Sequence, residues 1–180
     1  MFSGEWPIVR DLIFKIRKTL PNVLIVAGGE HVTALPEFSL YDCSDLDICV
    51  VGEGEHTFYE ILEAKYNDID FNEVSGICFL DKSKQYISTG KQDRIRKIDA
   101  IPWPYWPKGY LEKFWNAGKS YGVASKRDMP ILGSRGCPYQ CTFCSNSLMW
   151  TTRYILRDID DLISEIKYYQ KKYDITALQF

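Results

Sequence analysis

The sequence predicts an α/β protein built on a doubly wound sheet. Two short apolar runs, Val23–Ala27 and Asp47–Val51, each end in a glycine-rich turn. Continuous apolar runs of this length are typical of parallel strands buried on both faces of a sheet. Helical segments alternate with the runs, which is the rhythm of α/β layering. Because such sheets normally open with a strand and here a helix comes first, we expect the N-terminal part of the sheet to be missing.

The first half of the chain is predicted to contain two long helices. Pro7 suits a first helical turn, and apolar residues then recur at helical spacing as far as Leu20. After the two strands, Thr57–Tyr66 is predicted to form the second helix. Its predicted apolar face consists of Phe58, Ile61 and Leu62.

A hairpin and a connector are predicted next. Gly76–Leu80 and Tyr86–Ser88 flank a polar turn, which indicates a hairpin. The segment Ile101–Pro107 holds three prolines and three aromatic rings, so it is predicted to be an irregular connector that packs on a neighbouring surface.

The last third is predicted to run strand, loop, helix, strand. Met129–Leu132 is the first strand, Asp158 caps a helix that continues through Lys172, and Ile175–Phe180 opens another strand. The residues predicted to face inward from this helix are Leu162, Ile163, Ile166 and Tyr169.

Composition excludes several classes of protein. The 22 basic and 24 acidic residues give a net charge of −2, so there is no electrostatic case for nucleic acid. No apolar run approaches the length of a membrane helix, and Met1–Phe14 lacks the features of a secretory signal. The six cysteines are therefore expected to be reduced thiols or metal ligands in a cytoplasmic protein. Surface ion pairs are expected for Arg135, Arg153 and Arg157.

Three cysteines, Cys137, Cys141 and Cys144, fall within eight residues. Their spacing could place them on one face of a buried helix, but Gly136 and Pro138 bracket the first of them. A structural zinc site wants four ligands, and no cysteine or histidine follows Cys144. Three thiolates on a short loop suit an iron–sulfur cube with one open iron instead. The other cysteines, Cys43, Cys49 and Cys78, show no ligand spacing, and Cys49 and Cys78, which lie in strand-like runs, are expected to be buried and structural.

Two glycine turns follow the predicted strands. They are Gly28-Gly29, followed by Glu30 and His31, and Gly52-Glu53-Gly54. Glycines after strands are common turn residues, so each turn alone is a weak signal. Both turns are nevertheless predicted at the carboxyl ends of parallel strands, where α/β folds bind ligands.

The cysteine loop resembles the signature of radical S-adenosylmethionine enzymes. The shared pattern is C-x3-C-x2-C with an aromatic, Phe143, before the last cysteine, set between a strand and a helix. The resemblance implies that Cys137, Cys141 and Cys144 hold a 4Fe–4S cluster whose open iron binds S-adenosylmethionine, with Phe143 near the adenine. It further implies reductive cleavage to a 5′-deoxyadenosyl radical, and an electron donor of the flavodoxin or ferredoxin type.

Nearly the whole chain also resembles enzymes in which a cobalamin-binding domain precedes the radical core. The resemblance rests on Gly-Gly-x-His-x-Thr-x-x-Pro-Glu, on Gly-Glu-Gly-Glu and on the proline-rich connector. It implies that the cobalamin nucleotide and corrin edge are lined by Gly28, Gly29, Gly52, Glu53 and Gly54. The family's Asp-x-His-x-x-Gly motif is absent, so His31 and His56 are expected to form turn hydrogen bonds and not to bind cobalt.

The resemblance implies three regions: 1–75, a partial Rossmann-like cobalamin domain; 76–128, the hairpin and connector; and 129–180, the start of a (β/α) barrel with the cluster loop. We therefore expect a fragment of an enzyme that methylates, cyclises or rearranges an unknown small molecule, and that is inactive as an isolated chain. The alternatives are a tRNA methylthiotransferase-like protein with a second cluster, a non-catalytic cobalamin-binding module, and a zinc-binding protein.

Overall fold

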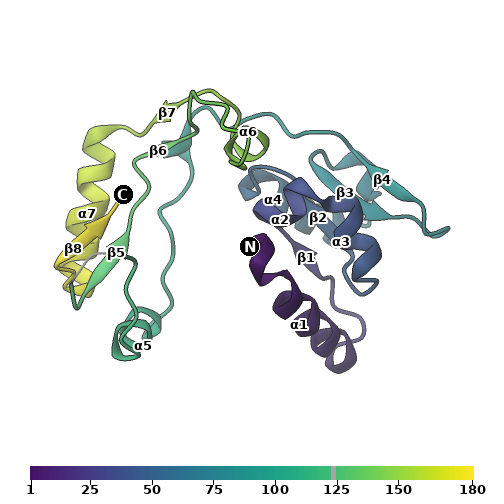
Figure 1. The fold of residues 1–180 in the computed structure, drawn as a ribbon, viewed down its shortest axis with the longest axis horizontal. Coiled ribbons are helices and arrows are strands. Elements are labelled where there is room, and N and C mark those ends of the chain that lie inside the picture. The colour runs from purple at the N-terminus through teal and green to yellow at the C-terminus, as the bar shows by residue number, and fades with distance from the viewer. Residues whose placement is uncertain (123–124) are drawn as a thin grey trace. The chain divides into compact units, whose positions relative to one another are not determined.

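The structure is a computed structural model that describes residues 1–122 and 125–180. Val123 and Ala124, which fall inside the predicted connector, lie outside the described residues. The chain forms two compact units (Figure 1). The first unit comprises 1–95 together with 136–153, and the second comprises 96–135 together with 154–180. Among the described residues, no helix has the length and apolar character needed to cross a membrane.

The first unit contains a four-stranded sheet in the order β1-β2-β3-β4. The strands are β1 (Val26–Ala27), β2 (Ile48–Val50), β3 (Ile77–Leu80) and β4 (Tyr86–Ser88). β1 and β2 are parallel, whereas β2–β3 and β3–β4 are antiparallel. The predicted hairpin therefore extends this sheet. β1 is shorter than predicted and only half-buried, because it is an edge strand with a single neighbour.

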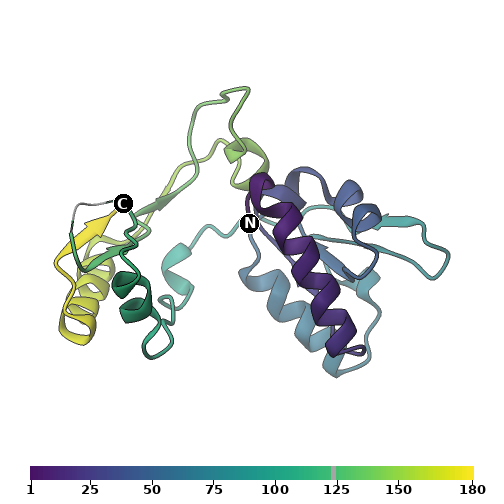
Figure 2. The same cartoon turned by 60° about the horizontal axis from the view of Figure 1, so that its bottom comes forward.

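Helices cover both faces of the sheet (Figure 2). The helices of this unit are η1 (Ser3–Glu5), α1 (Trp6–Thr19), α2 (Glu30–Ala34), α3 (Pro36–Asp42), α4 (Glu55–Tyr66), η2 (Phe71–Glu73) and α6 (Asn146–Met149). Alternate strand residues point to opposite faces. Cys49 and Cys78, which are cross-strand partners, accordingly join a core with α1 and α3, while Ile48 and Ile77 join a second core with α4. This two-faced burial confirms the layered α/β prediction.

The buried face of α4 differs from the predicted one. Ile61 is fully buried as expected, but Phe58 and Leu62 are about half exposed. Thr57 and Ala64 take their place against the sheet. Small side chains at these two positions allow the helix to approach the sheet closely, which the apolar pattern alone does not reveal.

The second unit contains the predicted strand–helix–strand series. Its elements are η3 (Ile98–Ala100), α5 (Tyr110–Asn116), β5 (Asp128–Pro130), β6 (Ser134–Arg135), β7 (Ile155–Leu156), α7 (Ile159–Tyr173) and β8 (Ala177–Gln179). β5 and β8 pair in parallel, so β5, α7 and β8 form a β-α-β arrangement. β6 and β7 pair in antiparallel fashion. α5, β5 and α7 enclose an aromatic-rich core around Met129 and Tyr169.

Helix α7 begins where the sequence predicted, because the Asp158 carboxylate accepts a hydrogen bond from the Asp161 amide at 2.9 Å. Its inward face is partly different from the prediction: Ile163 is exposed and Glu165 is buried. Glu165 pairs there with Arg157, whose guanidinium side chain is only 7% exposed. The expected surface ion pair of Arg157 is therefore wrong, and this pair is internal.

Candidate functional site

The cysteine loop begins at a backbone position that only glycine tolerates. Gly136 has φ +92°, and a Cβ atom there would lie 2.2 Å from the carbonyl oxygen of Arg153. A side chain at this position would therefore push apart the two ends of the segment 136–153. The glycine allows the segment to leave and return at nearly the same point.

The three cysteines lie on an irregular stretch between β6 and α6. Cys137 is partly buried, Cys141 and Cys144 are exposed, and all three are free thiols. The Cys144 amide donates to the Cys141 carbonyl at 3.0 Å, and the Asn146 side-chain amide donates to the Cys137 carbonyl at 3.3 Å. These contacts involve the backbone of the cysteines, and none of them involves a sulfur atom. The interpretation of the three cysteines as one face of a buried helix is wrong, because they form no helix and two of them face solvent.

The donor set fits an iron–sulfur cluster in its chemistry. Cysteine thiolates are the ligands that hold such clusters, and this loop offers three thiols without other partners. In the described part of the chain, no three His, Cys, Asp or Glu side chains are gathered at metal-binding distance. Because the loop lies outside any helix or strand, its thiols can converge without breaking a regular element.

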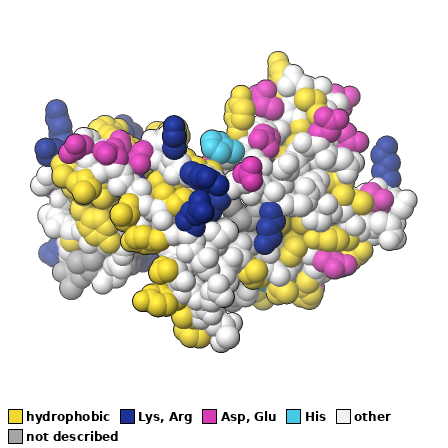
Figure 3. All heavy atoms as spheres, turned by 90° about the horizontal axis from the view of Figure 1, so that it is seen from above, with side chains coloured by type: hydrophobic (Ala, Val, Ile, Leu, Met, Phe, Trp, Pro, Cys, Tyr) yellow, Lys and Arg dark blue, Asp and Glu magenta, His cyan; other side chains and the backbone are white. Residues whose placement is uncertain are grey.

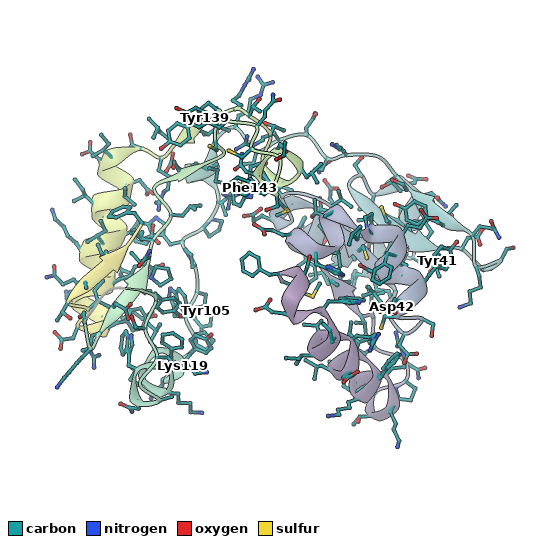
Figure 4. The ribbon with its side chains drawn as sticks, viewed as in Figure 1. Tyr41, Asp42, Tyr105, Lys119, Tyr139 and Phe143 are labelled. Carbon is teal, nitrogen blue, oxygen red and sulfur yellow. The ribbon has the colours of Figure 1, made fainter. Side chains whose placement is uncertain are left out.

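Two aromatic side chains flank these thiols. Phe143 is 92% exposed and Tyr139 is 71% exposed (Figure 4). The ring of Phe143 buries almost none of its surface against the described residues, so core packing does not explain it there. On the face shown in Figure 3, basic and acidic side chains lie among hydrophobic ones.

The two glycine turns are brought together at the carboxyl ends of β1 and β2, as predicted. Gly29 and Gly52 both have positive φ, +102° and +82°. The Thr33 hydroxyl, on α2 after the first turn, accepts a hydrogen bond from the Gly52 amide of the second turn at 3.0 Å. Thr33 therefore fixes one turn against the other.

Helix α6, which follows the cysteines, lies beside α2. A Cβ atom on Gly52 would lie 3.6 Å from the Met149 carbonyl oxygen, so the end of α6 also approaches the second turn. The structure thus collects the cysteine loop and both glycine turns in one unit.

Comparison with known proteins shows what this chain is similar to. Residues 1–62 match the family model of the B12-binding domain. An uncharacterized methyltransferase of Pyrococcus horikoshii is 31% identical over 93% of this chain and 35% of its own length. An anaerobic magnesium-protoporphyrin IX monomethyl ester cyclase of Synechocystis is also 31% identical, over 96% of this chain and 33% of its own length. The chain thus spans about a third of the length of these two relatives.

The fold agrees with these matches. The cobalamin-dependent S-adenosylmethionine radical enzyme OxsB, solved with aqua-cobalamin and S-adenosylmethionine bound, superposes with a TM-score of 0.77. The superposition covers 96% of this chain and 23% of that chain at 19% identity. Over most of its length, the chain is therefore similar to cobalamin-dependent radical S-adenosylmethionine enzymes.

In the second glycine turn, the carboxylate of Glu53 already has two partners. Its side chain is 5% exposed and faces the Arg94 guanidinium, with 3.6 Å between Oε2 and Nε. The same oxygen accepts a hydrogen bond from the Ile95 amide at 2.8 Å. Sequence reasoning missed Arg94, because it lies far along the chain from both glycine turns and from the cysteines.

His31 lies inside the cobalamin-domain segment and is 4% exposed. Its ring stacks on Trp6 with centroids 4.7 Å apart, and Nδ1 lies 3.1 Å from the Ser3 hydroxyl. Burial lowers the pKa of His31, against the opposing influence of Asp42. A neutral ring packed on an indole is consistent with the predicted structural role of this histidine. His56 is exposed on the first turn of α4.

The remaining cysteines are core residues, as predicted for Cys49 and Cys78. Cys43, Cys49 and Cys78 are all at most 1% exposed. Burial raises the pKa of the Cys49 thiol to about 12, so it stays protonated at neutral pH. The Cys78 sulfur accepts a hydrogen bond from the Tyr86 hydroxyl at 3.0 Å. A protonated thiol in an apolar core is a poor metal ligand.

Proposed function

We propose that this chain is the cofactor-binding part of a cobalamin-dependent radical S-adenosylmethionine enzyme. The observation that carries the proposal is the set of three free thiols on the irregular loop 137–144, in the same compact unit as the B12-binding segment 1–62. Cys137, Cys141 and Cys144 would hold a 4Fe–4S cluster. Three cysteines leave one iron without a protein ligand, which suits chelation of S-adenosylmethionine.

When bound, the cluster would supply the single electron that breaks the S–C5′ bond of S-adenosylmethionine, giving methionine and a 5′-deoxyadenosyl radical. The residues of this chain would bind and orient the cofactors. The exposed ring of Phe143 offers a flat apolar surface for an adenine. Gly28, Gly52 and Gly54 present backbone without side chains at the carboxyl ends of β1 and β2, where a large ring can approach closely. Gly29 belongs to the same turn, but a Cβ atom there would lie 2.4 Å from the backbone nitrogen of Met1. The backbone of Glu53 belongs to this surface, while its carboxylate holds the turn through Arg94 and Ile95.

The reaction of the whole protein is proposed only by class: methyl transfer, cyclisation or rearrangement of a small molecule, with electrons from a flavodoxin- or ferredoxin-type donor in the cytoplasm. A methyltransferase and a cyclase are both among the relatives. In the proposed division of the chain, 1–75 serves cobalamin, 76–128 connects, and 129–180 begins the radical core. The described residues contain one β-α-β arrangement, whereas a closed (β/α) barrel is built from several, so we propose that the isolated chain does not turn over.

Anaerobic reconstitution tests the proposal. Iron and sulfide analysis is expected to give four of each per chain, and Cys144→Ala is expected to lose most of that iron, while Cys43→Ala, which changes a buried core thiol, keeps it. Eight irons per chain would favour a methylthiotransferase-like protein. Zinc after aerobic purification would favour a zinc protein, and cobalamin retention without iron would favour a non-catalytic module. Any of these three outcomes overturns the proposed function.

A further inference from the structure

Arg94 connects the cysteine loop to the glycine turn of the cobalamin domain. It lies in the segment after β4, and its side chain is 12% exposed. Its Nη1 atom donates to the Arg153 carbonyl at 2.6 Å and to the Thr151 hydroxyl at 3.0 Å. Both acceptors lie where the segment 136–153 ends, so a single guanidinium holds the end of the cysteine loop.

The same guanidinium also lies close to the start of that segment. A Cβ atom on Gly136 would be 3.0 Å from Nη2 of Arg94. Arg94 is therefore packed where the two ends of the loop meet. Thr151, one of its partners, has φ +60°, a left-handed conformation that a β-branched residue rarely adopts. A hydrogen bond from a charged donor stabilises that unfavourable conformation.

On its other side, Arg94 faces Glu53 of the Gly52–Gly54 turn. The carboxylate is 5% exposed and lies 3.6 Å from Nε, and it is fixed in turn by the Ile95 amide. A charged pair with so little solvent contact is weakly screened, so a displacement of one partner changes the interaction energy of the other. The contacts run without a gap from the glycine turn, through Glu53 and Arg94, to Thr151 and Arg153.

We propose that Arg94 is a positioning residue that couples the cysteine loop to the Gly52–Gly54 turn, so that occupancy of one site changes the affinity of the other. This inference rests on the proposed function, which puts the cluster on the loop and cobalamin at the turn. Coupling of this kind is reciprocal and typically changes affinity by about 5- to 150-fold. The contact of α6 with α2 is a second route between the two sites, and it predicts that some coupling survives without Arg94.

The test measures cobalamin affinity in cluster-free and cluster-loaded protein by absorption titration. In the wild type, the two dissociation constants are expected to differ by about fivefold or more. Arg94→Ala is expected to reduce that ratio to within about twofold of unity. Arg94→Lys keeps the charge but lacks the fork that contacts Glu53 and both loop acceptors, so it serves as a second variant and is expected to lose most of the ratio. Arg96→Ala, an exposed neighbour, is the matched control and keeps it.

Hydrogen exchange gives a readout that needs no cofactor. Amides of α6, such as Met149 and Trp150, donate within that helix and should be protected. In Arg94→Ala, their exchange is expected to be about tenfold faster, while exchange in α1, which Arg94 does not contact, is unchanged.

Equal affinity ratios in wild type and both Arg94 variants, or unchanged α6 exchange, overturn the inference. Failure of the wild type to take up a cluster or cobalamin overturns the proposed function, and the coupling with it, whereas normal uptake with no affinity difference overturns the coupling alone.

Discussion

Replacing Arg157 by methionine is expected to destabilise the second unit strongly. Arg157 lies just before α7, and its guanidinium is 7% exposed. It contacts Asp99 at 3.1 Å and the Leu132 carbonyl at 3.2 Å, and it also pairs with Asp161 and Glu165. Burial opposes the charge, but hydrogen bonds to Glu165, Asp161 and Asp99 raise the pKa of Arg157, so it remains protonated. One side chain therefore connects η3, the segment after β5 and two turns of α7.

The size of the loss follows from the exposure of each partner. Asp99 and Asp161 are 31% and 32% exposed, so each pair is worth at most about 1 kcal/mol. The side chain of Glu165 is 3% exposed, and removing its partner leaves a buried carboxylate uncompensated. Breaking such a pair costs about 3–5 kcal/mol. The buried pair with Glu165 therefore dominates, and Arg157→Met is expected to lower the free energy of unfolding by about that amount.

Urea unfolding followed by fluorescence measures this loss, and Trp103 supplies a local probe because its indole N–H donates to Asp161 at 3.1 Å. Asp99→Asn is the control and is expected to cost at most about 1 kcal/mol. Combining Arg157→Met with Glu165→Met removes both buried charges, so the double variant should be more stable than Arg157→Met alone. A loss below about 1 kcal/mol for Arg157→Met, or strict additivity of the two changes, would refute the reasoning.

Three further outcomes are expected. Gly136→Ala should reduce iron incorporation at least severalfold in reconstitution, because the new Cβ atom would lie 2.2 Å from the Arg153 carbonyl oxygen. Gly90→Ala is the control: Gly90 also has a positive φ, +87°, but open space around it, so this variant should keep the iron content of the wild type. Burial lowers the pKa of His31, so the unfolded chain binds more protons than the folded one below about pH 6.5. The free energy of unfolding should therefore fall as pH is lowered from about 7 to 5, and His31→Phe, which keeps the ring stacked on Trp6, should flatten that dependence in urea titrations. An unchanged slope would contradict this assignment. Asp158→Ala removes the cap of α7 and should cost about 1 kcal/mol in urea unfolding, while Asp160→Ala, in the first turn without that capping bond, should cost less; equal losses would argue against the cap.

Sequence reasoning found the elements whose signals are local. The hairpin is bounded as predicted, at Leu80 and Tyr86, because its polar turn is encoded by adjacent residues. The cap at Asp158 was likewise found, since a cap depends only on the residues that follow it. The cysteine loop was recognisable for the same reason: its ligands are separated by three and two residues.

The buried faces were harder to predict, because they depend on what lies opposite. Ile163 reads as a core residue and Glu165 as a surface one, yet Glu165 is buried because Arg157 meets it there. Phe58 was assigned to the core, but the tight contact of α4 with the sheet favours Thr57 and Ala64. Hydrophobicity ranks single residues, whereas burial of a charge requires a partner that may be distant in the chain.

The amino-acid sequence by itself determined the α/β layering, the glycine turns at the ends of β1 and β2, and the trio of cysteines, because each is a short-range pattern set by backbone geometry and side-chain chemistry. Only the tertiary structure decided that the segment 136–153 packs in the same unit as the B12-binding segment, and that Arg94 holds it to Glu53. These contacts join residues 41 to 59 positions apart, and no periodicity or motif spacing encodes such a pairing. They arise only when the chain has closed and the surrounding side chains have excluded water.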